Sequence, residues 1–435
     1  MCRIAFLSEH ANPLAARGGA DAGGQNVYIS ELCQQLAQRG YQVDVFTRRD
    51  TPDGPEIINW LPGIRVISVQ AGPTIVCPKD SIWPFMHEFM LGILAFLTRE
   101  QRQYDLIHSN FWMSGWVAVE LKRRLTLPVV HIFHAMGKTK QRNQGTLDSS
   151  PAERLEIEQY VINGVDRIIA QCPEEQRELI EDYDTPAHKV AVIPSAVNIN
   201  VFSPVDCQQA RHTIGFDSDD FIVVYVGRLL PRKDVRNVVR GVAHLVELVR
   251  RDTRHTYPGI KFLIVGGETD IPSPLHTPEI AVLQELAADL HIDDVLHFIG
   301  KRQQEMLRYY YSAGNVVVTT PWYEPFGLTP LEGMACGRPV IGSAVGGITY
   351  TIADGITGFH VPAKDPAALA RKLFQLFLQP SLGIQMGHAA RQRVEQLFSW
   401  HITAQRTGEL YNEVLSETQI SSNFTINEYN QKKEF

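Results

Sequence analysis

Short apolar segments alternate with amphipathic helical patterns along almost the whole chain, and this alternation constrains the fold more than any other feature. Strands are expected at residues 4–7, 43–47, 66–69, 106–108, 129–133, 167–170 and 190–193, and again at 221–226, 261–265, 296–299, 316–319 and 339–342. Helices are expected at residues 26–39, 153–164, 235–250, 279–290 and 366–378. Because each helix carries the chain from one strand to the next, the pattern predicts an α/β fold with parallel sheets covered by helices on both faces.

The alternation pauses at residues 194–204 and restarts near residue 220, which predicts a boundary between two domains. A chain of 435 residues has room for two or three domains. The prolines and asparagines of the pause are typical of a connecting segment. We therefore expect two doubly wound domains that face a central cleft. Their expected bounds are residues 1–205 and 206–398, followed by a helix at 399–415 that returns to the first domain and a polar tail at 416–435 without helical periodicity.

The charge balance and the apolar segments narrow the possible partners. The chain has 41 Lys and Arg against 48 Asp and Glu, and its net charge of −7 argues against nucleic acid as the main partner. The longest uncharged apolar run, residues 89–97, is too short for a transmembrane segment, and the N-terminus lacks a signal-peptide pattern. The six cysteines show no metal-binding spacing. We therefore expect a soluble, cytoplasmic protein without a metal or other cofactor.

A glycine-rich segment, residues 18–26, lies between the first expected strand and its helix. Its glycines allow a ligand to approach the backbone closely, and the first amides of the following helix are suited to an anion. The alternative is a flexible loop in which Asn26 caps the helix. Ligands of open parallel sheets bind beyond the carboxyl ends of the strands, which is where this segment lies.

Two cations follow the first strand of the second domain. Arg228 and Lys233 come directly after residues 221–226, at the carboxyl end of the expected strand. A diphosphate would balance two cations that converge there, whereas exposed surface cations are the alternative interpretation.

Two glutamates follow a later strand of the same domain. Glu324 lies between two proline-containing turns and is interpreted as functional. Glu332 follows Thr329 by three residues, and Pro330 lies between them. This spacing predicts a capping box in which Glu332 binds the Thr329 amide.

Histidines end two strands of the first domain. His108 and His134 lie at strand ends, and Lys140 follows shortly after His134. His131 alternates inward along its strand and is expected to be a core histidine. His134 is therefore the histidine that we expect to meet a ligand.

Taken together and in this order, these segments resemble the retaining, nucleotide-sugar-dependent glycosyltransferases of the GT-B type, which have two Rossmann-like domains. More narrowly, they are similar to family four (group 1), which includes sucrose-phosphate synthase and D-inositol-3-phosphate glycosyltransferase. The most specific element is the pair Glu324 and Glu332, and the GGQN, GRLLPRK and VGG segments support it. The resemblance extends from residue 3 to residue 415.

The resemblance implies roles for individual residues. Catalytic roles fall to His134, Glu324, Arg228 and Lys233. Donor-binding roles fall to Gly23, Gly24, Arg228, Lys233, Arg302, Leu328, Thr329 and Glu332. Acceptor-binding roles fall to His10, Gln25, Asn26, Lys79, Lys140 and Arg154. The chain departs from the family pattern at Asp234, where Gly or Asn is common, and at Ala135, where Ser or Thr contacts the acceptor.

The implied reaction moves a hexosyl group from a nucleotide sugar, expected to be a UDP-sugar, to a sugar or cyclitol acceptor with retention of configuration and without a metal. Lys79, Lys140 and Arg154 lie in loops or helix starts of the first domain and suggest a phosphorylated acceptor. A solvated basic face, with Arg154 paired to Glu158, is the alternative. Other possible functions are a catalytically inactive nucleotide-sugar-binding relative and a same-fold epimerase or phosphorylase.

Overall fold

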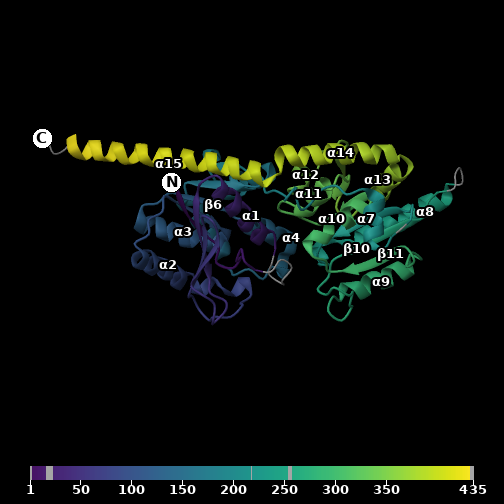
Figure 1. The fold of residues 1–435 in the computed structure, drawn as a ribbon, viewed down its shortest axis with the longest axis horizontal. Helices are drawn as coiled ribbons and strands as arrows, with labels where there is room; N and C mark the ends of the chain where they lie inside the picture. The colour runs from purple at the N-terminus through teal and green to yellow at the C-terminus, as the bar shows by residue number, and fades with distance from the viewer. Residues whose placement is uncertain (1, 16–22, 217, 253–256, 432–435) are drawn as a thin grey trace. The chain divides into compact units, whose positions relative to one another are not determined.

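The structure, a computed structural model, describes residues 2–15, 23–216, 218–252 and 257–431, and it divides into two compact units (Figure 1). Unit 1 comprises Met1–Ile193 and Trp400–Phe435, and unit 2 comprises Pro194–Ser399. The division lies before the expected boundary at residues 205 and 206, because the connector is bonded to unit 2. The amide of Val197, for example, donates to the carbonyl of Phe398 at 2.9 Å.

Unit 1 is built on an eight-stranded sheet in the order β3-β4-β2-β1-β5-β6-β7-β8. Its strands are β1 (Arg3–Leu7), β2 (Gln42–Arg48), β3 (Ile57–Leu61), β4 (Ile64–Val69), β5 (Leu106–Asn110), β6 (Val129–Ile132), β7 (Arg167–Ala170) and β8 (Val190–Val192). Neighbouring strands are parallel except β3 and β4, which are antiparallel. The expectation of a purely parallel sheet is wrong at this edge, because the turn at Pro62 and Gly63 (φ +82°) reverses the chain without a helix.

The helices of unit 1 are α1 (Gly24–Gln38), α2 (Met86–Glu100), α3 (Phe111–Leu125), α4 (Gly137–Gln144), α5 (Arg154–Gly164), α6 (Pro173–Tyr183) and α15 (Trp400–Gln431). The chain crosses the sheet in opposite directions after β1 and after β5. Right-handed crossovers therefore place α1 and α3 on opposite faces of the sheet.

The last helix, α15, packs against α1 of unit 1. Arg39 donates to the carbonyl of His401 at 3.0 Å, and the hydroxyl of Tyr411 lies 2.5 Å from Nδ1 of buried His108. We expected a polar tail without helical structure from residue 416. This expectation is wrong for residues 416–431, because α15 continues to Gln431. A helix satisfies its own backbone hydrogen bonds and so can continue without an apolar face.

Unit 2 is built on a six-stranded sheet in the order β11-β10-β9-β12-β13-β14, in which all neighbouring strands are parallel. Its strands are β9 (Phe221–Val226), β10 (Ile260–Val265), β11 (Leu296–Gly300), β12 (Val316–Thr319), β13 (Val340–Ser343) and β14 (Gly358–Val361). Its helices are α7 (Cys207–Ile214), α8 (Val235–Arg251), α9 (Glu279–Asp289), α10 (Gln304–Ala313), α11 (Leu328–Ala335), α12 (Ile348–Thr351), α13 (Pro366–Leu378) and α14 (Pro380–Leu397). The edge strand β14 is absent from the sequence-based expectation. Both units confirm the predicted α/β class.

Each sheet has one point where the strand order reverses. In unit 1 this switch point lies between β1 and β5, and in unit 2 it lies between β9 and β12. Helices leave neighbouring strands toward opposite faces at such a point, which opens a crevice beyond the carboxyl ends of the strands. The segments that follow β1, β5, β9 and β12 are therefore the places to look for ligand-binding residues.

Candidate functional site

At the switch point of unit 2, a carboxylate meets a group of cations. The carboxylate of Glu324, after β12, is paired with Nζ of Lys233, after β9. A guanidinium nitrogen of Arg232 lies 3.6 Å from the same carboxylate oxygen, and Arg228 is exposed beside them. Burial raises the pKa of Glu324, but the charges of Lys233, Arg232 and Arg228 outweigh it and lower the pKa overall. Glu324 is therefore ionised, and the cations beside it exceed its single negative charge.

Two glycines hold the backbone of Glu324 in place. The amide of Gly347 donates to the Glu324 carbonyl at 3.0 Å. A Cβ on Gly346, which has φ +46°, would lie 2.2 Å from that carbonyl oxygen, so only glycine fits there. The two glycines of the VGG segment, Gly346 and Gly347, thus hold Glu324 in position.

The predicted capping box at Thr329 and Glu332 is wrong. Helix α11 begins at Leu328, its N-cap is Gly327 at φ +91°, and no side chain caps it. Glu332 instead accepts a hydrogen bond of 2.6 Å from the hydroxyl of Tyr311 on α10. The left-handed backbone of Gly327 starts the helix before Thr329, so Thr329 lies inside the first turn. Burial raises the pKa of Glu332 to about 7, although the bond from Tyr311 opposes this shift.

Arg302, the remaining predicted donor residue with a long side chain, follows β11. It donates to the hydroxyl of Tyr310 at 3.1 Å and to the carbonyl of Asp270 at 2.8 Å. These bonds fix its guanidinium against the loop after β10.

Asp234, where the family pattern favours Gly or Asn, has φ +50°. Gly and Asn adopt this left-handed conformation easily, and Asp tolerates it. The departure from the family pattern at Asp234 therefore concerns the backbone conformation of this residue.

His134 follows β6 of unit 1 and has its hydrogen-bonding pattern fixed by Asn110. The amide nitrogen of Asn110 donates to the Leu7 carbonyl at 3.2 Å, which leaves its oxygen 3.0 Å from Nε2 of His134. An oxygen can only accept, so Nε2 carries the hydrogen and Nδ1 has the free lone pair. Burial lowers the pKa of His134 to about 3, so the ring is neutral. Its ring meets the edge of Tyr28 at 4.9 Å.

Three of the predicted acceptor residues surround one aromatic ring. Phe111 starts α3 with an unusual φ of +75°. Nζ of Lys79 lies 5.9 Å from the ring centroid, and the guanidinium carbon of Arg154 lies 5.3 Å from it. The ring of His10 meets it edge-on at 4.9 Å. Segments that follow β1, β4 and β6 therefore converge on the residue that follows β5.

Lys140 joins this group through Ser150. Its Nζ lies 2.9 Å from the Ser150 hydroxyl and 2.8 Å from a carboxylate oxygen of Asp148. Arg154 donates to the same hydroxyl at 3.1 Å and to Glu158 at 2.8 Å, and only 3% of Arg154 is exposed. The pairing of Arg154 with Glu158, given above as the alternative, is thus present. Folding thus brings a carboxylate to both Lys140 and Arg154.

The glycine-rich segment is only partly described. Residues 18–22 lie outside the described residues. Helix α1 begins at Gly24, and the side chain of Asn26 accepts from the amide of Gly23 at 3.1 Å and donates to the carbonyl of Asn12 at 3.0 Å. Nε2 of Gln25 lies 3.4 Å from the Ser8 hydroxyl. Asn26 therefore stabilises the helix start, but from the third position of α1: the N-cap is Gly23, not Asn26 as the alternative interpretation expected.

Sequence reasoning missed several neighbours of these residues. Asn110 and Phe111 lie at the end of β5, and their position beside the switch point was a usable signal. Tyr311 and Tyr225 support the glutamate and cation segments of unit 2, since the Tyr225 hydroxyl donates to the Arg228 carbonyl at 2.9 Å. Their partners are distant or backbone groups, so no spacing in the sequence indicates them.

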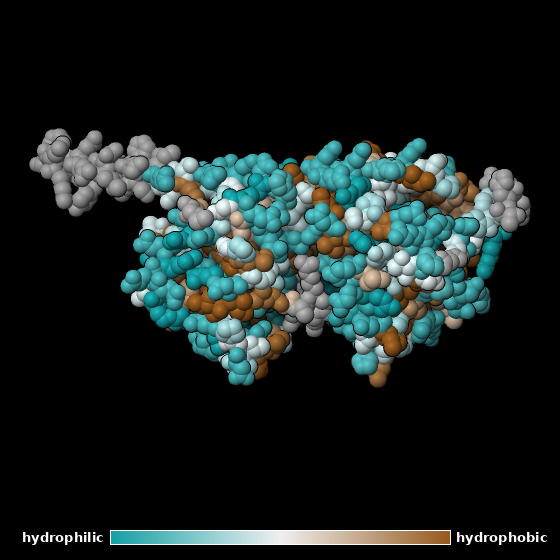
Figure 2. Space-filling model, viewed as in Figure 1, coloured by the Kyte–Doolittle hydropathy of each residue, from teal (hydrophilic) through white to brown (hydrophobic). Residues whose placement is uncertain are grey.

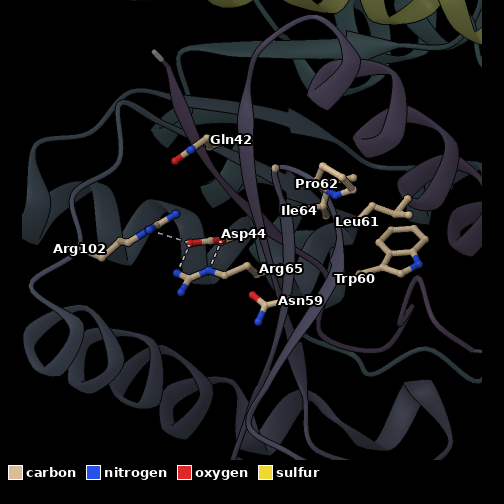
Figure 3. Close-up of a pocket in the computed structure, with 10 residues that line it drawn as sticks. Gln42, Asp44, Asn59, Trp60, Leu61, Pro62, Ile64, Arg65 and Arg102 are labelled. Carbon is tan, nitrogen blue, oxygen red and sulfur yellow. Dashed lines mark hydrogen bonds and ion pairs between the residues drawn. The ribbon is translucent and has the colours of Figure 1, made fainter.

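A cavity of about 500 Å³ opens elsewhere in unit 1 (Figure 3). Gln42 and Ile64 begin β2 and β4, so the cavity lies at the amino ends of these strands. In its wall Asp44 accepts two hydrogen bonds from Arg65, at 2.9 and 2.7 Å, and lies 3.1 Å from Nε of Arg102. Arg65 also lies 4.0 Å from a carboxylate oxygen of Glu100, so two carboxylates face two guanidinium groups within the chain. The switch-point residues lie at the opposite strand ends. We interpret this network as structural.

Among the described residues, no helix is both long enough and apolar enough to cross a membrane. On the face drawn in Figure 2, hydrophilic residues predominate and hydrophobic ones form limited patches.

Two doubly wound units, each with its candidate residues at a switch point, are the architecture of the GT-B class. Two family models match the chain, described as Glycosyltransferase Family 4 at residues 22–201 and Glycosyl transferases group 1 at residues 207–393. The D-inositol 3-phosphate glycosyltransferase of Streptomyces scabiei is 37% identical over 95% of this chain and 92% of that protein. Its counterpart from Frankia alni is 36% identical over 95% of this chain and 100% of that protein.

Solved structures agree with this match. Sucrose-phosphate synthase from Thermosynechococcus elongatus superposes with a TM-score of 0.83 and 33% identity over 96% of this chain and 100% of that one. Anabaena HepE in complex with UDP and glucose, at 18% identity and a TM-score of 0.70, shares the fold. The chain belongs to the family 4, group 1 glycosyltransferases of the GT-B fold, and it is an enzyme that transfers glycosyl groups.

Proposed function

We propose that this enzyme transfers a hexosyl group from a nucleotide sugar, a UDP-sugar in the first instance, to a phosphorylated sugar or cyclitol, with retention of configuration and without a metal. The observation that carries the proposal is the excess of positive charge around Glu324 at the switch point of unit 2. A sugar nucleotide brings a diphosphate, which is the anion suited to such a group. The relatives D-inositol 3-phosphate glycosyltransferase and sucrose-phosphate synthase, whose names include a phosphorylated cyclitol or sugar, support a phosphorylated acceptor.

In the proposed donor site, Arg228 and Lys233 bind the diphosphate and Glu332 binds the ribose. Arg302, Leu328 and Thr329 lie near the nucleotide, and Gly23 and Gly24 leave room for the donor phosphates. Only 17% of the Lys233 side chain is exposed, and burial lowers its pKa even though Glu324 opposes the shift. A largely buried cation that is held in place stabilises charge on a leaving group with little further reorganisation.

In the proposed acceptor site, Lys79 and Lys140 bind the phosphate, while His10, Gln25 and Asn26 border the sugar or cyclitol ring. Arg154 contributes by holding its neighbours, because it donates to the Ser150 hydroxyl at 3.1 Å and to the Ala135 carbonyl at 2.7 Å. The neutral ring of His134 accepts a hydrogen bond at Nδ1 from a substrate hydroxyl.

The proposed transfer needs no side chain of the protein as a base to take the proton of the acceptor hydroxyl. The acceptor hydroxyl oxygen forms a bond to the anomeric carbon, and the bond from that carbon to the diphosphate oxygen breaks. The hydroxyl proton passes to the departing diphosphate, whose remaining charge Arg228 and Lys233 offset. The ionised Glu324 supports positive charge that develops on the sugar ring. Attack from the face of the leaving group gives retention.

A screen of nucleotide sugars against fructose 6-phosphate, inositol 3-phosphate and their unphosphorylated forms tests the proposal. Nucleotide release is measured with and without EDTA, and NMR assigns the anomeric configuration of the product. We expect release with a phosphorylated acceptor, unchanged by EDTA, and a product with the donor's configuration. Nucleotide-sugar binding without release would indicate an inactive relative, and an altered sugar without an acceptor would indicate an epimerase.

A further inference from the structure

Glu9 is a buried carboxylate beside one of the proposed acceptor residues. It lies two residues after the end of β1, its side chain has no exposed area, and one of its oxygens lies 2.7 Å from Nδ1 of His10. The other oxygen accepts a hydrogen bond from the hydroxyl of Ser114 on α3. A buried carboxylate needs such partners, and here one of them is an imidazole that is itself 12% exposed.

The bonds around Ser114 and Glu9 determine where the hydrogens lie. The oxygen of Ser114 accepts from the Glu9 amide at 3.1 Å, so its own hydrogen is directed to the Glu9 carboxylate. An ionised carboxylate only accepts, and Nδ1 of His10 must therefore carry a hydrogen. In a neutral imidazole the other nitrogen, Nε2, is then an acceptor.

We propose that Glu9 and Ser114 hold His10 in its Nδ1–H form, so that Nε2 accepts a hydrogen bond from a hydroxyl of the sugar or cyclitol acceptor. Glu9 is a positioning residue and His10 is the group that meets the substrate. The proposal rests on the proposed function, because it gives His10 a chemical task within the acceptor site. His10 also packs edge-on against Phe111, the ring that Lys79 faces, so a hydroxyl at Nε2 would belong to the same ligand as a phosphate at Lys79.

The two histidines of the proposed acceptor site then present opposite nitrogens. Asn110 keeps the hydrogen of His134 on Nε2, whereas Glu9 keeps the hydrogen of His10 on Nδ1. Both rings accept at their remaining nitrogen. A ligand with several hydroxyl groups supplies the donors that two such acceptors require.

The test uses the full-length protein with ¹⁵N-labelled histidine. Long-range ¹H–¹⁵N spectra distinguish protonated from unprotonated ring nitrogens, and the His10→Asn variant identifies the His10 signals. We expect a protonated Nδ1 in the wild-type protein, and a shift of the Nε2 signal on titration with fructose 6-phosphate or inositol 3-phosphate. The Glu9→Gln variant offers an amide that donates to Nδ1, so the hydrogen moves to Nε2. Its acceptor KM should rise about tenfold while its donor KM stays within about twofold.

Ser114→Ala and Glu175→Gln complete the set of variants. Ser114→Ala removes one partner of Glu9 and should raise the acceptor KM about threefold. Glu175 is another buried glutamate of unit 1, and its oxygen accepts from the Gln171 amide at 2.7 Å. Burial raises its pKa to about 8, so glutamine resembles its neutral form and Glu175→Gln should leave both KM values unchanged.

Three results would overturn the inference: a wild-type His10 with its hydrogen on Nε2, a Glu9→Gln variant with a wild-type acceptor KM, or a His10 signal that neither acceptor shifts. Sugar transfer persists in all three, so they leave the proposed function intact. A wild-type protein that transfers no sugar, but whose His10 is Nδ1-protonated and responds to the acceptors, contradicts the proposed function and not the role of Glu9.

Discussion

The two units differ in the charge of the side chains at their switch points. In unit 2 the positive charges of Arg228, Arg232 and Lys233 face the single carboxylate of Glu324. In unit 1 burial lowers the pKa of His134 to about 3, and Lys140 is paired with Asp148. An excess of positive charge suits a diphosphate, whereas neutral imidazoles suit the hydroxyl groups of an acceptor. The comparison supports the proposal that unit 2 stabilises the leaving group and unit 1 orients the acceptor.

The largest expected effect follows from removing the largely buried cation of unit 2, Lys233. Lys233→Met should lower kcat by about 100-fold or more, because charge on the departing diphosphate loses its stabilisation. The control is Lys261→Met, since Lys261 is also paired with a carboxylate of unit 2, Asp220 at 3.5 Å, but lies at the amino end of β10. Steady-state kinetics with varied donor and acceptor measure both. Equal activity of the two variants would remove the basis for the donor assignment.

A smaller effect is expected at the acceptor site. Lys140→Ala should raise the acceptor KM about tenfold with kcat and the donor KM nearly unchanged, because one charge-assisted contact to the phosphate is lost. Lys122, which is paired with Asp166 at 2.7 Å in the same unit, provides the matched control as Lys122→Ala. If Lys140→Ala changed the donor KM instead, the division of tasks between the units would be wrong.

The third prediction concerns the pH dependence caused by Glu332. Its pKa is raised to about 7 in the folded chain, against about 4.5 in the unfolded chain, so the folded state holds a proton that the unfolded state has lost between these values. The free energy of unfolding should therefore fall as pH rises from 4.5 to 7, by at most about 1.4 kcal/mol per pH unit. Urea denaturation across this range measures the slope.

Glu332→Gln should remove this part of the slope, since glutamine does not titrate. Tyr311→Phe removes the hydrogen bond that lowers the pKa of Glu332 and should move the slope to higher pH. An unchanged slope in both variants would show that Glu332 titrates normally.

The smallest expected effect is at Asn110. Asn110→Ala removes the bond that fixes the hydrogen of His134 and leaves the Leu7 carbonyl without that donor. We expect a loss of about 1–2 kcal/mol of stability and an acceptor KM about threefold higher. Thermal unfolding and kinetics measure these quantities, and Ser109→Ala, which removes the 2.8 Å contact with buried His131, controls for a general loss of polar contacts in the sheet. A larger effect of Ser109→Ala on the acceptor KM would contradict the assigned role of Asn110.

How far the sequence predicts this molecule depends on the range of the interactions involved. Apolar segments indicate which residues are buried, and their alternation with helical patterns indicates parallel strands. The α/β class and most strands could therefore be predicted from the sequence. The strand ends then indicated Arg228, Lys233 and Glu324 as site residues. Their ion pair could not be predicted, because two loops far apart in the sequence form it.

Local patterns failed where backbone geometry or a distant partner decided the outcome. The capping-box spacing at Thr329 was satisfied in the sequence, but Gly327 starts the helix earlier and Tyr311 takes the carboxylate of Glu332. The pairing of Arg154 with Glu158 one helical turn away, the alternative to a phosphate ligand, follows from the spacing alone and is present. Glu9 gave no signal, because its partner Ser114 lies on α3, far away in the sequence.

Calorimetric titration of UDP and of inositol 3-phosphate into the wild-type protein and the Lys233→Met and Lys140→Ala variants tests the division between the two units most directly. The account predicts that Lys233→Met weakens UDP binding at least tenfold and leaves inositol 3-phosphate binding unchanged, and that Lys140→Ala does the reverse. Equal weakening of both ligands by either variant, or wild-type binding of UDP by Lys233→Met, would contradict it.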